Sequence, residues 1–549
     1  MVGYWTSIFK EIGVRIHKFW KQISILLVVV LAVAGMSVTP RTASAQAKTE
    51  LVYGSFDTVD VLDPNVTSFS AVGGMMAQVV EGLTWEPKLG TIVPGLASSW
   101  KVSADVKEYT FNLRKDVKFQ DGTPFNAQAV KFTFDRIANP DTKSQTAASL
   151  IGPYQETQVV DDYTVVVKFK QPYSPFLSNA ATPYLGIVSP TAFQKAGAEW
   201  GKTVMVGSGP FKVQSFTPDS ELVLVKNPDY NWAPDFFGVN GAAKLDKITF
   251  KIIQEPATRL AALENGDVDF IDQTPETDVK RLKDGGKFTV VQIEQPGSGW
   301  SLMMNVTKAP TDDLAVRKAI ALGSDKQGMI DTVFNGLGTP GCSPLTKVMF
   351  GYDPKSCTYL PYDPTQAAKV LDDDGWKMGS DGIRAKNGQP LVLEHWFRSD
   401  SPTNVAMATF MQADLKKLGI KVNLNGAARA GYFDAVRSGK HNTQNWWDTQ
   451  TEPDAMIRTL LSSDNADGGT NRNRYKNPKM DALIDAASST VDLQKRADLY
   501  AQIQKLEADD AVMVFYDDPY LFYSQTPKLQ GAVPLGGGTY IDFYAASFK

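Results

Sequence analysis

Helical and strand-like patterns alternate along the whole chain, and no repeat, heptad or long low-complexity linker separates them. Tyr109, Phe111 and Leu113 alternate with polar residues, which is typical of a half-buried strand. Asn126 then stands where a helix N-cap is expected, ahead of an apolar helical face. A chain of 549 residues is too long for one ordinary core, because domains cluster near ~100–150 residues. The sequence therefore predicts an α/β protein whose lobes are joined by short crossings.

Three later helices are predicted from their end signals and their apolar spacing. Asp363 and Asp492 each precede an amphipathic segment and are suited to cap it. Met407 and Met411 begin an apolar series at helical spacing, and Gly419 supplies the residue that ends this helix. These helices continue the mixed pattern to the end of the chain.

The first 45 residues have the pattern of an export signal. Basic residues precede an apolar run at residues 23–36, and Ala43-Ser44-Ala45 follows before Gln46. A 14-residue helix spans ~21 Å, which is short of the ~30 Å hydrocarbon core of a bilayer. We therefore expect cleavage near Ala45 and a mature protein that is soluble in the periplasm; an uncleaved membrane anchor is the alternative.

Charge and cysteine content agree with export. The formal net charge is −4, and removal of five basic residues and one acidic residue with the signal makes it −8, which disfavours a nucleic-acid partner. Cys342 and Cys357 are the only cysteines and lie in a turn-rich segment. In an oxidising compartment we expect them to form a disulfide, whose loop closure is worth about 3 kcal/mol. Two buried free thiols, or one reactive thiol without a nearby histidine, are the alternatives.

The sequence carries no recognisable catalytic motif. Residues 336–341 fit G-x-G-x-x-G, but Pro340 and Pro344 forbid the helix that must follow to bind a phosphate. After cleavage only His395 and His441 remain, and neither stands beside a nucleophile signature. So few histidines and cysteines exclude multi-Cys/His zinc or iron–sulfur sites. We expect no metal, no cofactor and no enzymatic activity.

Five long motifs follow one another in the order of one protein family. They are IVPGLASSWKVSADVKEYTFNLRKDVKFQDGTPFNAQAVKFTFDRI (92–137), VGSGPFKV with LVKNPDYNW (206–213 and 224–232), RLAALENGDVDF (259–270), MMNVTKAPTDDLAVRKAIALGSDKQGMI (303–330) and YDPTQAAKVLDDDGW (362–376). Together they resemble family 5 of the extracellular solute-binding proteins, the dipeptide-, oligopeptide- and nickel-binding components of ABC importers. The resemblance covers essentially residues 50–549 and is closest in motifs to the dipeptide-binding proteins.

The resemblance implies two α/β lobes that clamp a ligand, the first lobe carrying an extra subdomain. It implies a monomeric periplasmic component that captures a small peptide-like or related polar solute and delivers it to a membrane permease. The expected boundaries are lobe I at 46–300, its extra subdomain at 86–208, lobe II at 301–518, and a return to lobe I at 519–549.

One ligand anchor is implied by the segment FRSDSPTN at residues 397–404. It resembles the segment by which dipeptide-binding relatives present an arginine to the ligand carboxylate. Arg398 is therefore expected to bind a carboxylate in bidentate fashion.

The second anchor departs from the family pattern W-x-x-D-x-x-[DE]-P, whose aspartate neutralises the ligand's amino terminus. Aligning Glu452 and the following proline puts Thr449 at the aspartate position, with Asp448 one place earlier. Adjacent strand residues face opposite ways, so Asp448 does not substitute automatically, and which of the two fills the position stays open. An ordinary dipeptide is thereby disfavoured, and a ligand without the free amine is favoured. The other candidate ligand-binding residues are Ser68, Phe69 and the aromatic walls Trp300, Trp396, Trp446 and Trp447.

The alternative function is an exported hydrolase of the same small solutes, using paired carboxylates such as Asp448 and Glu452. Nickel capture is less favoured, since only two histidines remain as ligands. The sequence leaves open the ligand (dipeptide, modified peptide, opine or sugar), the permease, and any chemoreceptor or chaperone role.

Overall fold

The computed structural model describes residues 48–67, 69–467 and 469–549. The compact unit Thr49–Lys549 contains all the elements described below. The predicted export signal at residues 1–45 lies outside the described residues. Within the described part of the chain, every helix is too short or too polar to pass through a bilayer.

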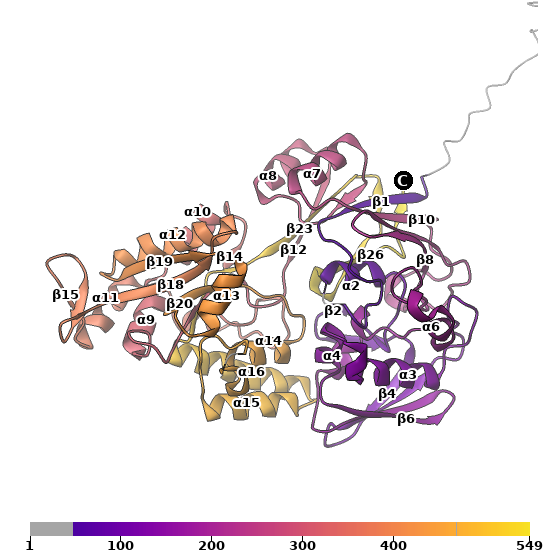
Figure 1. Cartoon of the computed structure of the whole chain (residues 1–549), viewed down its shortest axis with the longest axis horizontal. Coiled ribbons are helices and arrows are strands. Elements are labelled where there is room, and N and C mark those ends of the chain that lie inside the picture. Colours follow the sequence, from indigo (N-terminus) through magenta and orange to yellow (C-terminus); the bar gives the residue numbers. More distant parts are fainter. Residues whose placement is uncertain (1–47, 68, 468) are drawn as a thin grey trace, which may run out of the picture. The chain divides into compact units, whose positions relative to one another are not determined.

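A seven-stranded sheet combines strands from both ends of the second unit. In spatial order its strands are β12 (Thr289–Glu294), β23 (Tyr520–Gln525), β11 (Phe270–Ile271), β1 (Glu50–Ser55), β10 (Lys247–Ile252), β9 (Glu221–Lys226) and β8 (Phe211–Thr217). β1 is parallel to β10 and β11, whereas β23 is antiparallel to both of its neighbours. The C-terminal part of the chain therefore returns to the sheet that begins with β1 (Figure 1).

A four-stranded antiparallel sheet is inserted between β1 and β8. Its strands, in spatial order, are β4 (Ala97–Val102), β5 (Glu108–Leu113), β7 (Thr164–Phe169) and β6 (Tyr154–Asp161). Tyr109, Phe111 and Leu113 are buried, which confirms the alternating pattern of the sequence. The side chain of Asn126 accepts two bonds from first-turn N–H groups and caps α3 (Ala127–Ala138), as predicted. This sheet and the seven-stranded sheet share one continuous apolar core.

Short helices and strand pairs cover this half of the molecule. The helices are α2 (Ser70–Met76), α4 (Thr146–Ile151), α5 (Phe176–Asn179), α6 (Pro190–Ala196), α7 (Pro256–Asn265) and α8 (Glu276–Gly285). The paired strands are β2 (Thr84–Lys88) with β3 (Thr91–Pro94), β24 (Leu529–Gln530) with β27 (Ser547–Phe548), and β25 (Val533–Leu535) with β26 (Tyr540–Asp542).

A five-stranded sheet organises the other half. In spatial order its strands are β19 (Lys421–Ala427), β18 (Val392–Arg398), β20 (Thr443–Trp446), β13 (Ser301–Met304) and β21 (Met513–Phe515). β18 is parallel to β19 and β20, and β13 is antiparallel to β20 and β21. Leu302 and Met304 enter one apolar core while Met303 enters another, because successive side chains point to opposite faces. Both faces of this sheet are therefore buried.

Helices cover both of these faces. The first core includes side chains from α9 (Leu314–Gly323), α10 (Lys326–Val333), α11 (Pro364–Asp373) and α12 (Pro402–Lys416). The second includes side chains from α14 (Pro453–Leu461), α15 (Pro478–Ser488) and α16 (Leu493–Asp510). Two further features are α13 (Arg429–Arg437), which follows β19, and a small sheet of β15 (Lys377–Met378), β16 (Arg384–Lys386) and β17 (Gln389–Pro390).

The end signals of these helices act as the sequence predicts. Asp363 caps α11 and Asp492 caps α16, each accepting a backbone N–H of the first turn. Gly419 has φ +79° after α12, and its N–H donates to the carbonyl of Lys416, 3.0 Å away. The next N–H donates to the carbonyl of Leu415. This pair of bonds is a Schellman closure, which needs a left-handed residue such as glycine.

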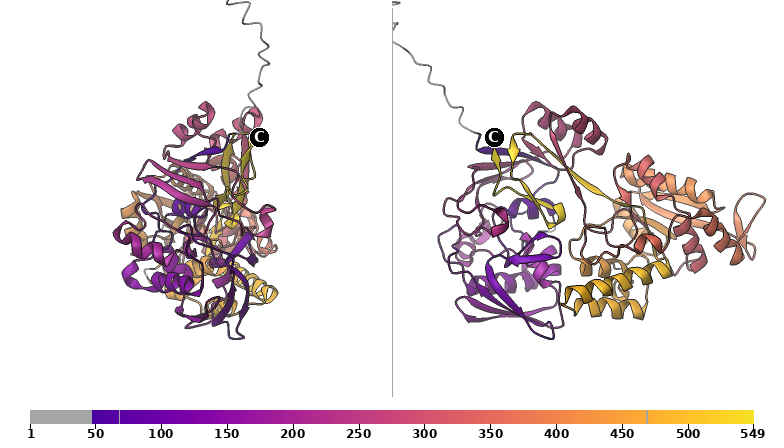
Figure 2. Two further views of the ribbon diagram at one scale, coloured as in Figure 1. Left: turned by 90° about the vertical axis from the view of Figure 1, so that its right-hand side faces the viewer. Right: turned by 180° about the vertical axis from the view of Figure 1, so that it is seen from behind.

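The chain crosses between the two halves twice. It passes from β12 to β13, and it returns from β21 to β23 through β22 (Asp517–Asp518), which pairs with β14 (Thr339–Pro340). We call the part built on the seven- and four-stranded sheets the first lobe, and the part built on the five-stranded sheet the second lobe (Figures 1 and 2). The structure is thus a two-lobed α/β fold with an extra subdomain in the first lobe, the predicted fold class.

The segment after α10 contains the predicted disulfide. Cys342 and Cys357 are bonded, with their Cα atoms 4.8 Å apart. The glycines at 336–341 form turns around β14, and no helix follows them, in agreement with the prediction that this motif is not a phosphate loop.

Candidate functional site

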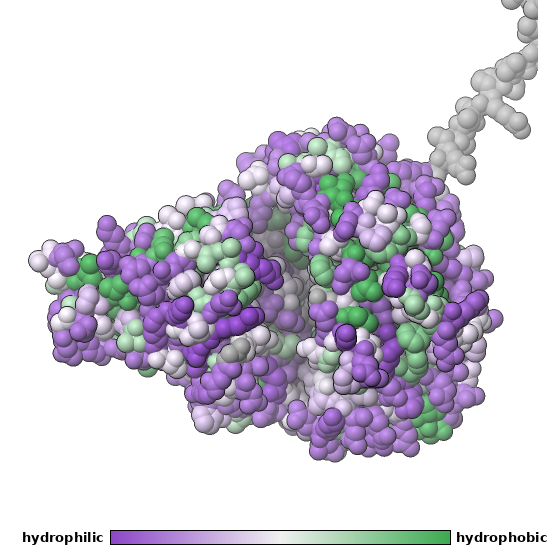
Figure 3. Space-filling model, viewed as in Figure 1, coloured by the Kyte–Doolittle hydropathy of each residue, from purple (hydrophilic) through white to green (hydrophobic). Residues whose placement is uncertain are grey.

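A hollow separates the two lobes on the face shown in Figure 3. It lies between α13 on the second lobe and the region of α2 and β2 on the first (Figures 1 and 3). On the second lobe, the parallel strands β18 and β20 pair at Trp396 and Gln444, and each ends two residues later, at Arg398 and Trp446, at the same edge of the sheet. The carboxyl ends of parallel strands are where ligands bind in α/β proteins. Two of the predicted binding segments, Arg398 and residues 446–449, therefore lie at one edge of the sheet.

Arg398, the last residue of β18, has a carboxylate partner within the chain. Its Nε lies 3.0 Å from Oδ1 of Asp400, and Nη2 lies 3.3 Å from Oδ2. The side chain of Arg398 remains 31% exposed, and its hydrogen bond to Asp400, together with its positive charge, lowers the pKa of that carboxyl. A ligand carboxylate that binds Arg398 must therefore share the guanidinium with Asp400 or displace Asp400 from it.

Thr449 and Asp448 lie against the crossing that follows β12. The hydroxyl of Thr449 accepts a hydrogen bond from the side-chain amide of Gln295. The backbone carbonyl of Asp448 accepts the N–H of Ser298 at 3.1 Å. A Cβ on Gly297, whose φ is +128°, would lie 2.1 Å from that carbonyl oxygen, so this close approach requires glycine. The proposed amine-anchor segment is thus part of the junction between the lobes.

The carboxyl group of Asp448 is perturbed by its surroundings. Burial raises its pKa to about 6, while the positive charge of Arg472 acts in the opposite direction. With this pKa the carboxylate is mostly charged near neutral pH, and Arg472 is a cation near it. A ligand ammonium bound at Asp448 would therefore share this carboxylate with Arg472.

The predicted aromatic residues separate into two groups. Trp447 is 42% exposed and stacks on Trp300, with centroids 5.9 Å apart, and Trp300 stacks in turn on Phe334. Trp446 packs instead against the guanidinium of Arg472. Trp447 is the exposed member of this set, whereas Trp300, Trp396 and Trp446 are half-buried.

The candidates of the first lobe are less informative. Phe69 precedes α2, and its carbonyl accepts the hydroxyl of Tyr184 at 3.3 Å. Ser68 lies outside the described residues.

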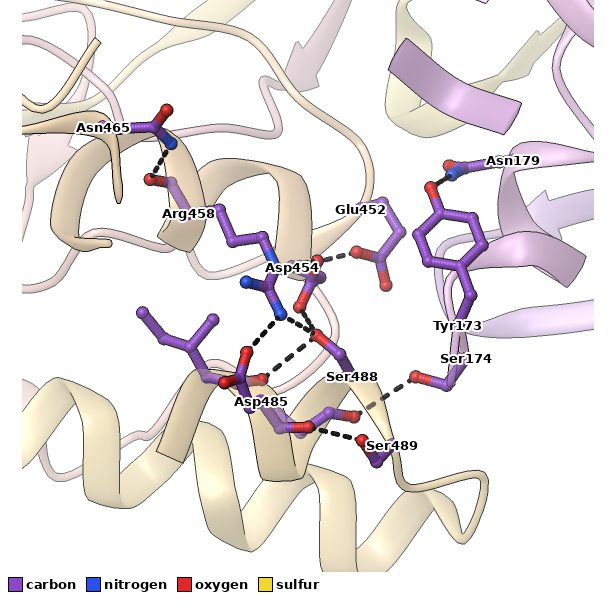
Figure 4. Close-up of polar contacts among 12 residues, drawn as sticks. Tyr173, Ser174, Asn179, Glu452, Asp454, Arg458, Asn465, Asp485, Ser488 and Ser489 are labelled. Atoms are coloured by element: carbon purple, nitrogen blue, oxygen red, sulfur yellow. Dashed lines mark hydrogen bonds and ion pairs between the residues drawn. The ribbon is translucent and has the colours of Figure 1, made fainter. Parts of the chain in front are cut away.

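The two lobes also touch away from the crossings. The N–H of Ser174 donates to the carbonyl of Ser488 at 2.8 Å, and its hydroxyl donates to the carbonyl of Ala487 at 3.2 Å. On the second lobe, Asp454 binds both Ser488 and Arg458, which holds the end of α15 in place (Figure 4). A cavity of about 260 Å³ adjoins this contact and is lined from both lobes.

Glu452, one member of the carboxylate pair required by the hydrolase alternative, is already engaged here. One carboxylate oxygen accepts a bond from Arg496 in a buried ion pair. The other accepts the N–H of Asp454 and caps α14. A carboxylate held in this way has a structural role, so it is poorly placed to act as an acid or base.

Both histidines are buried and hydrogen-bonded. His395 lies 3.0 Å from the hydroxyl of Thr443, and His441 donates to the carbonyl of Arg472 at 2.9 Å. Burial lowers the pKa of His395 to about 3 and that of His441 to about 4, so both are neutral near pH 7. Among the described residues, no group of three or more His, Cys, Asp or Glu side chains could hold a metal ion.

Sequence reasoning missed Asp400 and Arg472. Asp400 had a usable signal, because it follows Arg398 by two positions, and the chain turns there after β18 ends. Arg472 had none, since its contacts with Trp446 and Phe433 join segments far apart in the sequence.

Two α/β lobes, paired crossings and candidate anchors at one sheet edge define a solute-binding protein. The model of the bacterial extracellular solute-binding proteins, family 5 (middle region), matches residues 91–468, and the chain belongs to this family. It is therefore the periplasmic binding component of an ABC importer, as the sequence predicts.

Individual relatives match this chain over most of their length. The chain is 32% identical to the probable D,D-dipeptide-binding periplasmic protein DdpA of Escherichia coli (strain K12), covering 87% of this chain and 90% of the relative. It is 28% identical to the dipeptide-binding protein of the same strain, over 91% and 96%. Among solved structures, NikA from Brucella suis in complex with Fe(III)-EDTA matches with a TM-score of 0.78 and 27% identity, over 91% of this chain and 100% of that one.

Proposed function

We propose that this protein binds a small peptide-like or related polar solute between its lobes and delivers it, as a monomer, to the permease. The observation that supports this most strongly is the meeting of Arg398 and residues 446–449 at the carboxyl edge of one sheet. Arg398 holds a carboxylate of the solute, and the exposed face of Trp447 packs on its apolar part. Phe69 contributes from the first lobe.

The lobes close on the solute by rotation about the two crossings. The first lobe comprises residues 46–300 with the subdomain at 86–208, the second comprises 301–518, and residues 519–549 return to the first. The crossings lie side by side, since the N–H of Trp300 donates to Asp517 at 2.8 Å and that of Gln295 to the carbonyl of Pro519 at 2.9 Å. Two short adjacent segments suit a hinge, because few backbone angles need to change.

The solute is not an ordinary dipeptide with a free amine. Thr449 carries no charge and its hydroxyl is engaged by Gln295, while Asp448 lies near the cation Arg472. A desolvated ammonium left without a partner costs several kcal/mol. Relatives in this family are named for D,D-dipeptides, dipeptides, nickel and glutathione, so the fold accommodates chemically different solutes.

The protein returns its solute unchanged and has no enzymatic activity. Native mass spectrometry of protein purified without refolding tests both points. We expect one kind of small molecule to be bound, at up to one equivalent per protein. Its mass should be the same whether it is released at once or after prolonged incubation with the protein. Arg398→Ala should retain less of it, with Arg281→Ala, on α8 of the first lobe, as the matched control. Release of a cleaved product would overturn the binding-protein proposal. The proposal would also be overturned if the protein retained no solute through purification and bound none that was added.

A further inference from the structure

Three guanidinium groups surround the ring of Phe433 on the second lobe. The Cζ atoms lie 4.7 Å (Arg472), 5.5 Å (Arg437) and 5.6 Å (Arg429) from the ring centroid. Arg429 and Arg437 are the first and last residues of α13, and Arg472 comes from the loop before α15. We call these three residues the arginine cluster. Each contact is a cation–π interaction, and together they hold three like charges around one ring.

The arginine cluster has no carboxylate partner among the described residues. No ion pair involves any of the three side chains, whereas the nearby Arg398 is paired with Asp400. The acidic groups nearby are Asp434 on α13 itself, Asp400, which accepts the backbone N–H of Arg429 at 3.4 Å, and Asp448, whose charge acts on Arg472. Because like charges repel one another, and Arg437 disfavours the charged form of Arg472, an anion that joins the cluster stabilises it further.

Arg472 is the buried member of the cluster. The residue is 9% exposed, and its Nε and Nη1 are buried without a hydrogen-bond partner. Its Cζ also lies 4.2 Å from the ring centroid of Trp446, whose own Nε1 is buried and unpartnered. Because leaving buried N–H donors unpaired is costly, such donors indicate a missing acceptor.

The position of the cluster connects it to the candidate ligand site. Trp446, which stacks on Arg472, ends β20 at the level of Arg398. The charges of Arg472 and Arg398 both act on the hydroxyl of Tyr432, which donates to Oε1 of Gln444 at 2.6 Å, so both arginines lie near this residue. Figure 3 shows a strongly hydrophilic patch over α13 at the edge of the hollow.

We propose that Arg429, Arg437 and Arg472 form a second anion subsite, so that the solute carries an additional carboxylate besides the one held by Arg398. This inference rests on the proposed function and narrows its solute class to acidic, carboxylate-rich molecules. Arg472, enclosed by two aromatic faces, supplies directed N–H donors, and the exposed arginines at the ends of α13 add charge around them.

A matched pair of probes tests the inference. N-acetyl-Glu-Glu and N-acetyl-Gln-Gln both lack a free amine, carry the same terminal carboxylate, and differ only in side-chain charge. Isothermal titration calorimetry at fixed ionic strength should show about tenfold tighter binding of the acidic probe to the wild type. Arg437→Gln should reduce this preference about threefold, and Arg429→Gln with Arg437→Gln should nearly abolish it. Arg281→Gln, an exposed arginine on α8, should leave it unchanged.

Arg472→Gln as a single substitution should abolish the preference for the acidic probe. If this buried variant fails to fold, the Arg429→Gln and Arg437→Gln variants on the surface still test the inference. Equal affinity of the wild type for the two probes, no saturable binding of the acidic probe, or an unchanged preference in the α13 double variant would each overturn the inference. Native mass spectrometry separates this result from the proposed function: a retained solute without a second acidic group would leave the binding function standing and remove the second subsite.

Discussion

The hydroxyl of Thr449 accepts a hydrogen bond from the side-chain amide of Gln295, which ties the segment after β20 to the crossing that follows β12. The position where relatives are expected to carry an amine-binding aspartate is thus occupied by a neutral group that serves the hinge. If the lobes close about the crossings, this bond links the proposed recognition segment to the hinge.

Thr449→Asp should increase the affinity for the plain dipeptide Ala-Ala. The new carboxylate can still accept from Gln295 and supplies the charge that an ammonium requires. An ion pair of this kind is worth about 1 kcal/mol when partly solvated, or roughly fivefold in affinity. Calorimetry with Ala-Ala measures it, with Thr449→Asn as the neutral control of similar size. Tight binding of Ala-Ala to the wild type, lost in Asp448→Ala, would show instead that Asp448 is the amine anchor.

Arg398→Ala should weaken binding of N-acetyl-Gln-Gln, whose single carboxylate isolates this anchor. We expect a loss near the lower end of the ~2–5 kcal/mol typical of a charged hydrogen-bonded pair, because Asp400 already neutralises part of the charge. Asp400→Asn should have the opposite effect and tighten binding, since it frees the guanidinium. Unchanged affinity in Arg398→Ala would remove Arg398 from the site.

Reduction of the Cys342–Cys357 disulfide should lower stability without abolishing ligand binding. The bond closes a loop of 15 positions, and opening it costs about 3 kcal/mol through the entropy of the unfolded chain. Thermal unfolding with and without reductant measures the loss, and the double variant Cys342→Ser with Cys357→Ser should reproduce it. Loss of binding in that variant, while it remains folded, would show that the loop takes part in recognition.

The buried histidines should make the protein less stable in acid. The pKa of His395 is about 3 in the folded chain, against about 6.5 when unfolded. A lowered folded pKa means that the unfolded chain takes up the proton first, so stability is lost as pH falls below 6.5. Between pH 6.5 and 5 this amounts to about 2 kcal/mol.

The comparison that isolates this effect is the slope of unfolding free energy against pH in the wild type and in His395→Gln. Between pH 6.5 and 5, the unfolding free energy of the variant should fall by about 2 kcal/mol less than that of the wild type, whatever its absolute stability. Equal slopes would mean that His395 is accessible to protons in the folded protein.

The local elements followed from the sequence. The alternation at Tyr109 to Leu113, the cap at Asn126 and the closure at Gly419 all appear as predicted. These features depend on neighbours within a few positions along the chain, so the residues that decide them can be read together. The disulfide was also predictable, because an exported chain with two cysteines offers one pairing.

The candidate site depended on contacts that no local pattern contains. The resemblance to family segments pointed to Arg398 and to residues 446–449, but partners of this region come from distant segments. Gln295 is 154 positions from Thr449. Arg472 is 26 positions beyond Trp446 and 39 beyond Phe433. The sequence by itself determined which elements form and which family motifs they carry. Only the tertiary structure decided which charges meet and which remain without a partner, because the packing of the sheet edge, α13 and the crossings brings side chains together regardless of their separation along the chain.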